Sequence, residues 1–264
     1  MNIYGAPLYN STFIKNLPLS LPPLEQQKSI ASFLDQKCDL IQQLFQKIDL
    51  FLKKLEEYQE ALLYKLFQKN YSSSSKLKYL LQLYPSYKLP LTENESFSFI
   101  PMDHLKQGFH FTSQLSSISS NTYHVFQNGD LLLAKVTPCF ENGNIAIASI
   151  PTSFGYCSTE IFVLSSSQQQ VFLKYLFYCF QNPFLKSFWI SSMVGSSGLK
   201  RIDTTTFLNT VISYPSLAEQ QELCTFLDHK RTLFTKLQHH YDSLKVHLKE
   251  YQESLLYETF QNLS

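Results

Sequence analysis

The sequence predicts an α+β fold, in which one globular α+β domain is flanked by two long repeated helices that form an antiparallel coiled coil. Three observations support this prediction. One segment of the chain occurs twice, and each copy has the apolar spacing of a coiled-coil helix. The residues between the copies have the shorter pattern of strands and turns.

The repeat emerges when the chain is shifted against itself by 193 positions, which aligns residues 22–69 with 215–262 without a gap. Of these 48 positions, 20 are identical. Among the matches, Phe33-Leu34-Asp35 corresponds to Phe226-Leu227-Asp228. Chance does not produce an ungapped match of this length, so the two segments are copies of one element.

Each copy carries apolar residues at steps of alternately four and three, which is typical of a coiled-coil seam. Roughly 40 residues of helix would extend about 60 Å. Lys37 and Lys230 interrupt the seam at equivalent places, where a lysine either fixes the register or extends out of the seam. A helix with one apolar stripe needs a partner, and we expect each copy to pack against the other. The predicted seam comprises Ile30, Leu34, Ile41, Leu44, Ile48, Leu55, Leu223, Leu227, Leu237, Leu244, Leu248 and Leu255.

The domain between the copies is predicted to cover residues 77–206, after a polar linker at 70–76. Glycine at 195 and 198 predicts a flexible loop there. The patterns predict a turn that leads into a buried strand at Gly129–Val136 and further short strands at Ile145–Ile150 and Glu160–Leu164. They also predict a helix at Val171–Phe180, which Asn182-Pro183 closes.

Composition and motifs argue against several classes of protein. Hydrophobic residues make up 44% of the 264, charged residues 16%, and the net charge is +1, as in a folded protein. Five cysteines without a CxxC pair predict neither a disulfide framework nor a metal site. We expect a cytoplasmic protein that does not span a membrane, because no signal peptide or long apolar stretch is found. Phosphate-binding loops, zinc-protease motifs and hydrolase elbows are absent, so no catalytic residues are predicted.

Several motifs resemble those of one family. Pro-Ser-Leu-Ala-Glu-Gln-Gln at 215–221 is similar to the conserved helical region of the specificity subunits of type I restriction-modification systems, and residues 22–27 repeat it. Residues 129–132, 135–143 and 158–160 resemble a common type of target recognition domain in that family, as does the basic stretch at 198–202. By this resemblance, 22–69 and 215–262 are the two conserved helical regions and 77–206 is a target recognition domain.

The resemblance implies a function without chemistry in this chain. Such subunits read a split double-stranded DNA target, with one recognition domain for each half, and their helices act as a spacer that docks the methyltransferase (M) and restriction (R) subunits. S-adenosylmethionine, ATP and Mg belong to those partners. No cofactor is implied for this chain, which is expected to be a non-catalytic subunit.

Six residues are candidates for DNA contacts, because reading DNA requires cations and hydroxyls near phosphates and base edges. Lys135 and Thr137 have simple alternatives, as a solvated strand-end lysine and a turn residue. The candidates are Lys135, Thr137, Ser196, Ser197, Lys200 and Arg201.

The order of segments departs from the family, which has a recognition domain before each helical region. Residues 1–21 are expected to be the remnant of a preceding recognition domain, with Ile14–Leu21 at the position of Phe207–Tyr214. The chain then pairs with itself or with another specificity polypeptide to regain two readers. The alternatives are a non-functional truncated fragment and a coiled-coil adaptor without DNA binding.

Overall fold

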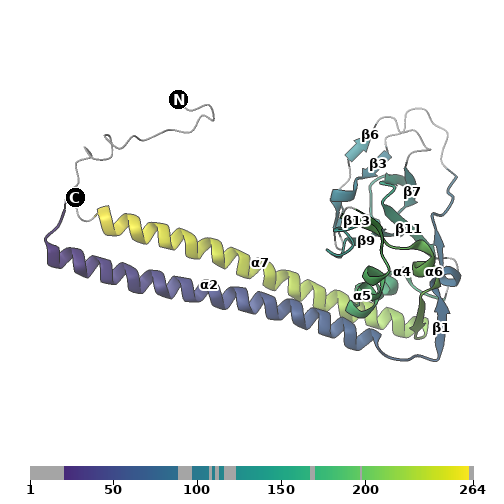
Figure 1. Cartoon of the computed structure of the whole chain (residues 1–264), viewed down its shortest axis with the longest axis horizontal. Helices are drawn as coiled ribbons and strands as arrows, with labels where there is room; N and C mark the ends of the chain where they lie inside the picture. Colours follow the sequence, from purple (N-terminus) through teal and green to yellow (C-terminus); the bar gives the residue numbers. More distant parts are fainter. Residues whose placement is uncertain are drawn as a thin grey trace. The chain divides into compact units, whose positions relative to one another are not determined.

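The computed structural model describes residues 21–88, 97–106, 109–110, 113–115, 123–166, 170–196 and 198–261, and Figure 1 shows its elements along the chain. Its contacts divide the chain into two units, which we call the helix-pair unit (Met1–Leu55 with Phe234–Ser264) and the domain unit (Glu56–Leu233). The two long helices are α2 (Leu24–Phe67) and α7 (Leu217–Gln261), and each contributes residues to both units. The expected remnant at 1–21 lies outside the described residues, except for Leu21.

In the helix-pair unit, α2 and α7 run antiparallel. The rings of Phe51 and Tyr241 lie 4.5 Å apart, and the Lys245 ammonium pairs with the Asp49 carboxylate. Further toward the start of α2, the Gln252 amide lies 3.9 Å from the Cys38 sulfur. Partners therefore advance along α7 as they recede along α2, which confirms the predicted antiparallel pairing.

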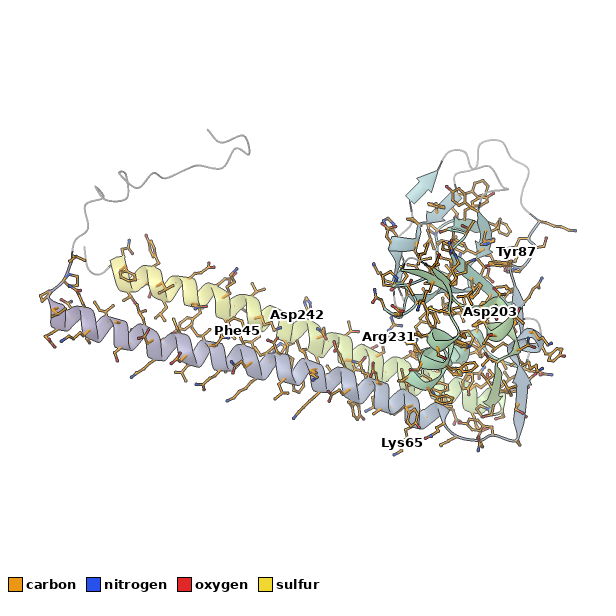
Figure 2. The ribbon with its side chains drawn as sticks, viewed as in Figure 1. Phe45, Lys65, Tyr87, Asp203, Arg231 and Asp242 are labelled. Carbon is orange, nitrogen blue, oxygen red and sulfur yellow. The ribbon has the colours of Figure 1, made fainter. Side chains whose placement is uncertain are left out.

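The predicted seam is correct at one heptad position and wrong at the other. Ile41, Ile48 and Leu55 are buried as expected, but Leu44, Leu237 and Leu244 are 45%, 38% and 37% exposed. In α2 the more buried position is the following residue: Leu52 is 9% exposed, and Phe45, which Figure 2 labels, is half-buried. The buried stripe of α2 therefore advances by four residues, from Ile48 to Leu52, where a step of three was predicted. Where two apolar residues are adjacent, the first of them lies at the edge of the interface. Ile30, Leu34, Leu223, Leu248 and Leu255 are half-buried, and Leu227 is buried in the domain unit.

The domain unit contains two four-stranded sheets. The first has the order β2-β11-β8-β9 and is antiparallel throughout. The second has the order β6-β3-β10-β7, with β3 and β10 parallel. Strands of the first sheet are β2 (Leu81–Leu83), β8 (Leu131–Ala134), β9 (Ile145–Ile147) and β11 (Ile161–Ser166). Strands of the second are β3 (Phe97–Ile100), β6 (Ser113–Leu115), β7 (His124–Gln127) and β10 (Phe154–Cys157).

Strand β8 is buried on both faces, which explains its unbroken apolar sequence. Leu131 and Leu133 face one hydrophobic core, shared with the helices of the domain. Leu132 and Ala134 face a second core, shared with residues of the β3-β10-β7 sheet. The sequence therefore predicted this strand correctly, together with β9 and β11.

Helices cover the first core. They are α3 (Leu77–Leu80), α4 (Leu173–Cys179), α5 (Pro183–Ser191) and α6 (Thr204–Asn209). The predicted helix at 171–180 is confirmed as α4, but Asn182-Pro183 begins another helix, because the Asn182 side chain accepts a hydrogen bond from the Phe184 N–H at 2.8 Å. Trp189 of α5 is fully buried, and its indole N–H donates to the Thr210 hydroxyl at 2.9 Å.

Two ribbons differ from the predicted loops. The polar linker contains β1 (Ser73–Lys76), which pairs antiparallel with β14 (Val211–Tyr214) and so joins the two ends of the domain. The expected flexible loop at 195–198 lies in a hairpin of β12 (Val194–Ser196) and β13 (Leu199–Arg201). Three short elements complete the unit: η1 (Met102–His104), β4 (Leu105–Lys106) and β5 (Phe109–His110).

Candidate DNA-recognition surface

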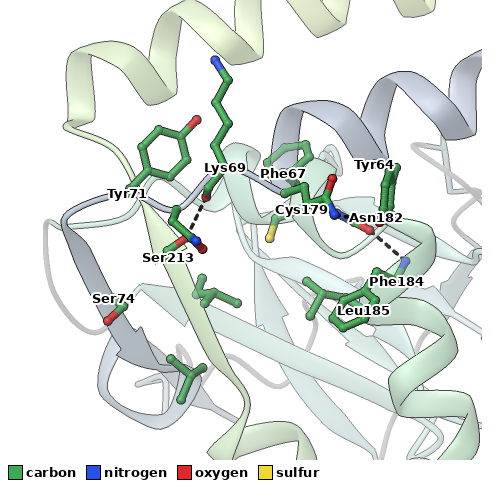
Figure 3. A pocket seen from close by; sticks show the side chains of 14 residues that line it. Tyr64, Phe67, Lys69, Tyr71, Ser74, Cys179, Asn182, Phe184, Leu185 and Ser213 are labelled. Atoms are coloured by element: carbon green, nitrogen blue, oxygen red, sulfur yellow. Dashed lines mark hydrogen bonds between the residues drawn. The ribbon is translucent and has the colours of Figure 1, made fainter.

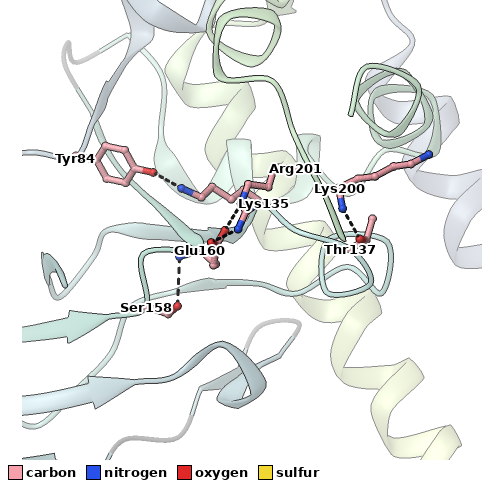
Figure 4. Close-up of polar contacts among 7 residues, drawn as sticks. All are labelled: Tyr84, Lys135, Thr137, Ser158, Glu160, Lys200 and Arg201. Atoms are coloured by element: carbon pink, nitrogen blue, oxygen red, sulfur yellow. Dashed lines mark hydrogen bonds and ion pairs between the residues drawn. The ribbon is translucent and has the colours of Figure 1, made fainter. Parts of the chain in front are cut away.

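The β12–β13 hairpin brings most of the predicted DNA-contacting residues together at the end of β8 (Figure 4). The Thr137 N–H donates to the Lys200 carbonyl at 3.0 Å, and the Ile202 N–H donates to the Lys135 carbonyl at 2.8 Å. Two segments more than 60 residues apart in sequence are thus joined by main-chain hydrogen bonds. We call the residues Lys135–Thr137 and Gly198–Arg201 the hairpin surface.

The Thr137 hydroxyl helps to hold this surface together. It donates to the Gly198 carbonyl at 3.0 Å and accepts from the Lys200 N–H at 3.0 Å. A hydroxyl used in this way fixes the backbone of the hairpin and leaves the Lys200 side chain exposed. Figure 4 shows the Lys200 side chain extending away from Lys135 and Glu160. A contact of Thr137 with DNA stays a prediction.

Lys135 lies in a half-buried aromatic setting. Its ammonium donates to the Tyr84 hydroxyl at 3.3 Å and lies 5.4 Å from the centre of the Phe162 ring. Burial lowers the pKa of Lys135, and the neighbouring Glu160 carboxylate opposes that effect. Tyr84 in turn stacks on His124, with ring centres 3.9 Å apart, and burial followed by the Lys135 charge lowers the pKa of that histidine. The lysine is therefore held in place and is not a freely rotating surface cation.

Arg201 is paired with Glu160. Its Nε donates to Glu160 Oε2 at 2.9 Å and its Nη2 donates to Oε1 at 2.7 Å, which is the forked geometry of a strong arginine–carboxylate pair. The hydrogen bonds from Arg201 lower the pKa of Glu160 and raise that of Arg201, so both groups are charged at neutral pH.

The remaining candidates are placed less fully. Ser196 is exposed on β12, opposite Leu199, whereas Ser197 lies outside the described residues. Sequence reasoning missed Glu160, Tyr84 and His124 as neighbours of Lys135. Glu160 is the last residue of the turn before β11, and the local sequence gives no signal of the arginine that it meets 41 positions later.

A second constellation, at the start of α7, fixes the domain to the helix. Gln220 is fully buried: its amide donates to the Pro215 and Gln170 carbonyls, at 2.9 and 3.1 Å, and its side-chain oxygen accepts from the Phe172 N–H at 2.9 Å. The Asp228 carboxylate accepts from the Lys174 ammonium and from the Tyr178 hydroxyl of α4. The residues of α7 that meet α4 and the segment before it are called the α4 seat; they are Gln220, Leu223, Cys224, Leu227 and Asp228.

A pocket of about 520 Å³ opens between the end of α2, the linker and α5 (Figure 3). Its lining includes Tyr64, Asn182, Phe184 and Ser213. Burial raises the pKa of the Cys179 thiol in this lining to about 12, so the thiol is protonated and is not a nucleophile.

The described part of the chain holds neither a metal-binding cluster nor a membrane-spanning helix. Among its residues, no three or more histidine, cysteine, aspartate or glutamate side chains gather as metal ligands would. No helix in this part of the chain has both the length and the apolar character for crossing a membrane.

Comparison with solved structures shows the fold. A chain from a study of assembly and conformational transition in the type I R-M system matches with a TM-score of 0.73 and 16% identity, over 91% of this chain and 60% of that chain. The HsdS subunit from Thermoanaerobacter tengcongensis matches with a TM-score of 0.59 and 15% identity, over 100% of this chain and 65% of the other. The chain thus shares the fold of these two solved chains.

Residues 74–240, more than half of the chain, match the family described as type I restriction modification DNA specificity domain, and the chain belongs to this family. Two curated relatives are specificity subunits from Escherichia coli. The chain is 36% identical to that of the type I restriction enzyme EcoAI and 30% identical to that of EcoEI, each over 143 residues. Each match covers 52% of this chain and 24% of the relative, so it spans about a quarter of the relatives' length.

Proposed function

We propose that this chain is the DNA-reading subunit of a type I restriction-modification complex, and that its domain unit reads one half of a split double-stranded target. The observation that carries the proposal is the hairpin surface. Lys135 comes from one segment and Lys200 and Arg201 come from another, and main-chain hydrogen bonds hold the two segments together in a domain of the specificity family.

The chemistry of this surface suits duplex DNA. Lysine ammonium groups bind phosphates as point charges, and arginine forms bidentate contacts with phosphates and with guanine. The exposed Lys200 fits a phosphate contact, because its side chain is free of the ion pair that holds Arg201. Ser196 would add a hydroxyl contact at the edge of the surface. Thr137, whose O–H already donates to the Gly198 carbonyl, would support DNA binding by holding the hairpin backbone in place.

The helices are proposed to act as a spacer and as the docking element for the M and R subunits. This chain contributes recognition without catalysis, and S-adenosylmethionine, ATP and Mg are bound by those partners. Such a complex works on DNA in the cytoplasm. These assignments are inferred from the family to which the chain belongs. The matches span 24% of the EcoAI subunit and 60% of the solved chain.

The other half of the target is proposed to be read by a second recognition domain, supplied by another specificity polypeptide or by a second copy. The repeat supports this idea, since α2 begins with counterparts of the α4 seat, including Gln27 and Asp35. In a second copy of this chain, α4 is already bound to that copy's own Asp228, so it would have to leave Asp228 before it could bind to Asp35. A different polypeptide whose equivalent of α4 is not already packed on a helix would not have to break such contacts first.

Titration of labelled random-sequence duplexes tests DNA binding directly. Fluorescence anisotropy is measured with the chain and its M subunits at about 50 and about 200 mM salt, where phosphate contacts weaken steeply. We expect the affinity to fall at least about tenfold over this salt range. A Lys135→Ala, Lys200→Ala double variant should bind more weakly at low salt and should depend less steeply on salt. Salt-independent or absent binding would favour the coiled-coil adaptor or the non-functional fragment.

A further inference from the structure

Among the described residues, no partner takes the second hydrogen-bonding edge of Arg201, although Glu160 holds the first. The guanidinium group has five N–H donors in a planar fork. Glu160 takes the side edge, formed by Nε and Nη2, with bonds of 2.9 and 2.7 Å. The end edge retains one N–H on Nη1 and one on Nη2. These two parallel donors have the spacing that matches the O6 and N7 acceptors of guanine in the major groove.

The carboxylate that holds Arg201 is itself anchored. The Glu160 carbonyl accepts from the Lys135 N–H at 3.1 Å, and its own N–H donates to the Ser158 hydroxyl at 3.3 Å. The Glu160 side chain is 29% exposed, whereas that of Arg201 is 45% exposed. The pair is therefore oriented with its carboxylate toward the domain and its guanidinium toward solvent.

The backbone beneath Arg201 is fixed as well. Arg201 is paired with Val194 in the hairpin and forms a bridge with Val136. The next residue, Ile202, is 3% exposed in the domain core. Because the main chain and the side chain of Arg201 are both constrained, its contact with a base would cost little conformational entropy.

We propose that Glu160 is a positioning residue that holds Arg201 in the orientation needed to read one guanine of the half-site. This inference rests on the proposed function, since it assumes that the hairpin surface enters a groove of DNA. In this arrangement Arg201 specifies one base pair, Glu160 acts through Arg201, and Lys200 contributes affinity without sequence preference.

Selection of binding sites from random duplexes tests the inference. The full chain is used with its M subunits, and the enriched sequences are compared for the wild type, Arg201→Lys, Glu160→Gln and Lys200→Ala. Arg201→Lys is the decisive variant, because lysine keeps a charge for Glu160 but lacks the fork. We expect it to lose the preference for G·C at one position by about tenfold to a hundredfold and to keep the other positions.

The remaining variants separate positioning from structure. Glu160→Gln should weaken the preference at the same position by a smaller factor, and Lys200→Ala should lower affinity equally for all sequences. An unchanged set of enriched sequences in Arg201→Lys overturns the inference and leaves the pair as a purely structural one. If Glu160→Gln fails to fold, as circular dichroism would show, Glu160→Asp replaces it. An unchanged preference at that position in a folded Glu160 variant overturns the positioning role of Glu160. Failure of the wild type to enrich any sequence contradicts the proposed function itself.

Discussion

The two copies of the repeat begin with matching residues but lie in different surroundings. Gln220 and its counterpart Gln27 each donate to the carbonyl of the proline five residues earlier, at 2.9 and 2.7 Å. Gln220 also bonds to the segment before α4 and is fully buried, whereas Gln27 is exposed. The shared bond belongs to the sequence of the helix start, and the burial comes from the domain that packs on it.

The acidic residues of the two copies show the same difference. Asp228 holds Lys174 and Tyr178 of α4, while its counterpart Asp35 is exposed on α2. Lys37 and Lys230, in contrast, lie over Phe33 and Phe226 in the same way, at 5.7 and 5.6 Å from the ring centres. Local contacts are thus duplicated, and the long-range contacts distinguish the copies.

The largest difference is expected between Leu227→Ala and Leu34→Ala. Leu227 is 4% exposed within the core of the domain unit, and its counterpart Leu34 is half-buried. We expect Leu227→Ala to lower the free energy of unfolding by about 3 kcal/mol and Leu34→Ala by about 1 kcal/mol. Urea denaturation measures both values. Equal losses would mean that the two helix starts are equally packed.

The glutamine pair should show the next largest effect. Gln220→Ala leaves the Phe172 N–H and the Gln170 carbonyl without their partner, which should cost about 2 kcal/mol of unfolding free energy. Gln27→Ala is the matched control and should change stability by less than about 0.5 kcal/mol, because Gln27 is exposed. A thermal melt that ranks the two variants in the opposite order would contradict the assignment of the α4 seat.

The aspartate pair should differ more modestly. Asp228→Ala removes the contacts with Lys174 and Tyr178, but these charges are partly exposed to solvent, which screens them. We expect a loss of about 1 kcal/mol, against no measurable loss for Asp35→Ala. Combining Asp228→Ala with Tyr178→Phe shows whether the hydrogen bond between these two side chains contributes to stability. Additive losses would indicate that the two side chains do not interact.

The smallest effect concerns pH. The Glu219 carboxylate accepts from the N–H and hydroxyl of Ser216, and these bonds lower its pKa. A carboxylate with a lowered pKa stabilises the folded state above its unfolded pKa of about 4.5, and this contribution is lost as the pH falls through the folded value. Glu219→Gln should therefore melt below the wild type at pH 7 and approach it near pH 3.

The first copy supplies the control for this last comparison. Gln26 stands where the second copy has Glu219, and Pro23 stands where it has Ser216. Proline offers neither an N–H nor a hydroxyl, so Gln26→Glu should gain no acid-sensitive stability. A pH-dependent melting temperature that shifts equally in both variants would show that the capping bonds are not the cause.

The sequence was sufficient to predict the elements whose signals are local or repeated. The duplication and its heptads predicted two paired helices, and the apolar run at 131–134 predicted a buried strand. The seam position failed because adjacent apolar residues, such as Leu44 with Phe45 and Phe51 with Leu52, fit either reading of the heptad. Only the packing of the partner helix separates them.

The sequence was sufficient to predict which cations belong to the candidate surface, but not how they are arranged. Lys135 and Lys200-Arg201 were found from their motifs, and the structure joins the two segments. The pairing of Arg201 with Glu160 depends on strand register across 41 residues, which no local pattern specifies. The sequence predicted a loop at 195–198 because glycine is frequent in loops. In the structure Gly195 and Gly198 lie in a β-hairpin, where both have positive φ, a conformation that glycine adopts readily.

One measurement tests the central claim that the hairpin surface meets DNA. Photo-crosslinking of the complex of chain, M subunits and a selected duplex, followed by mass spectrometry, identifies the peptides that touch the duplex. The account predicts crosslinks in peptides that contain Lys135 and Lys200-Arg201 and a marked loss of them in the Lys135→Ala, Lys200→Ala double variant. Crosslinks confined to α2 and α7, or unchanged in that variant, would contradict it.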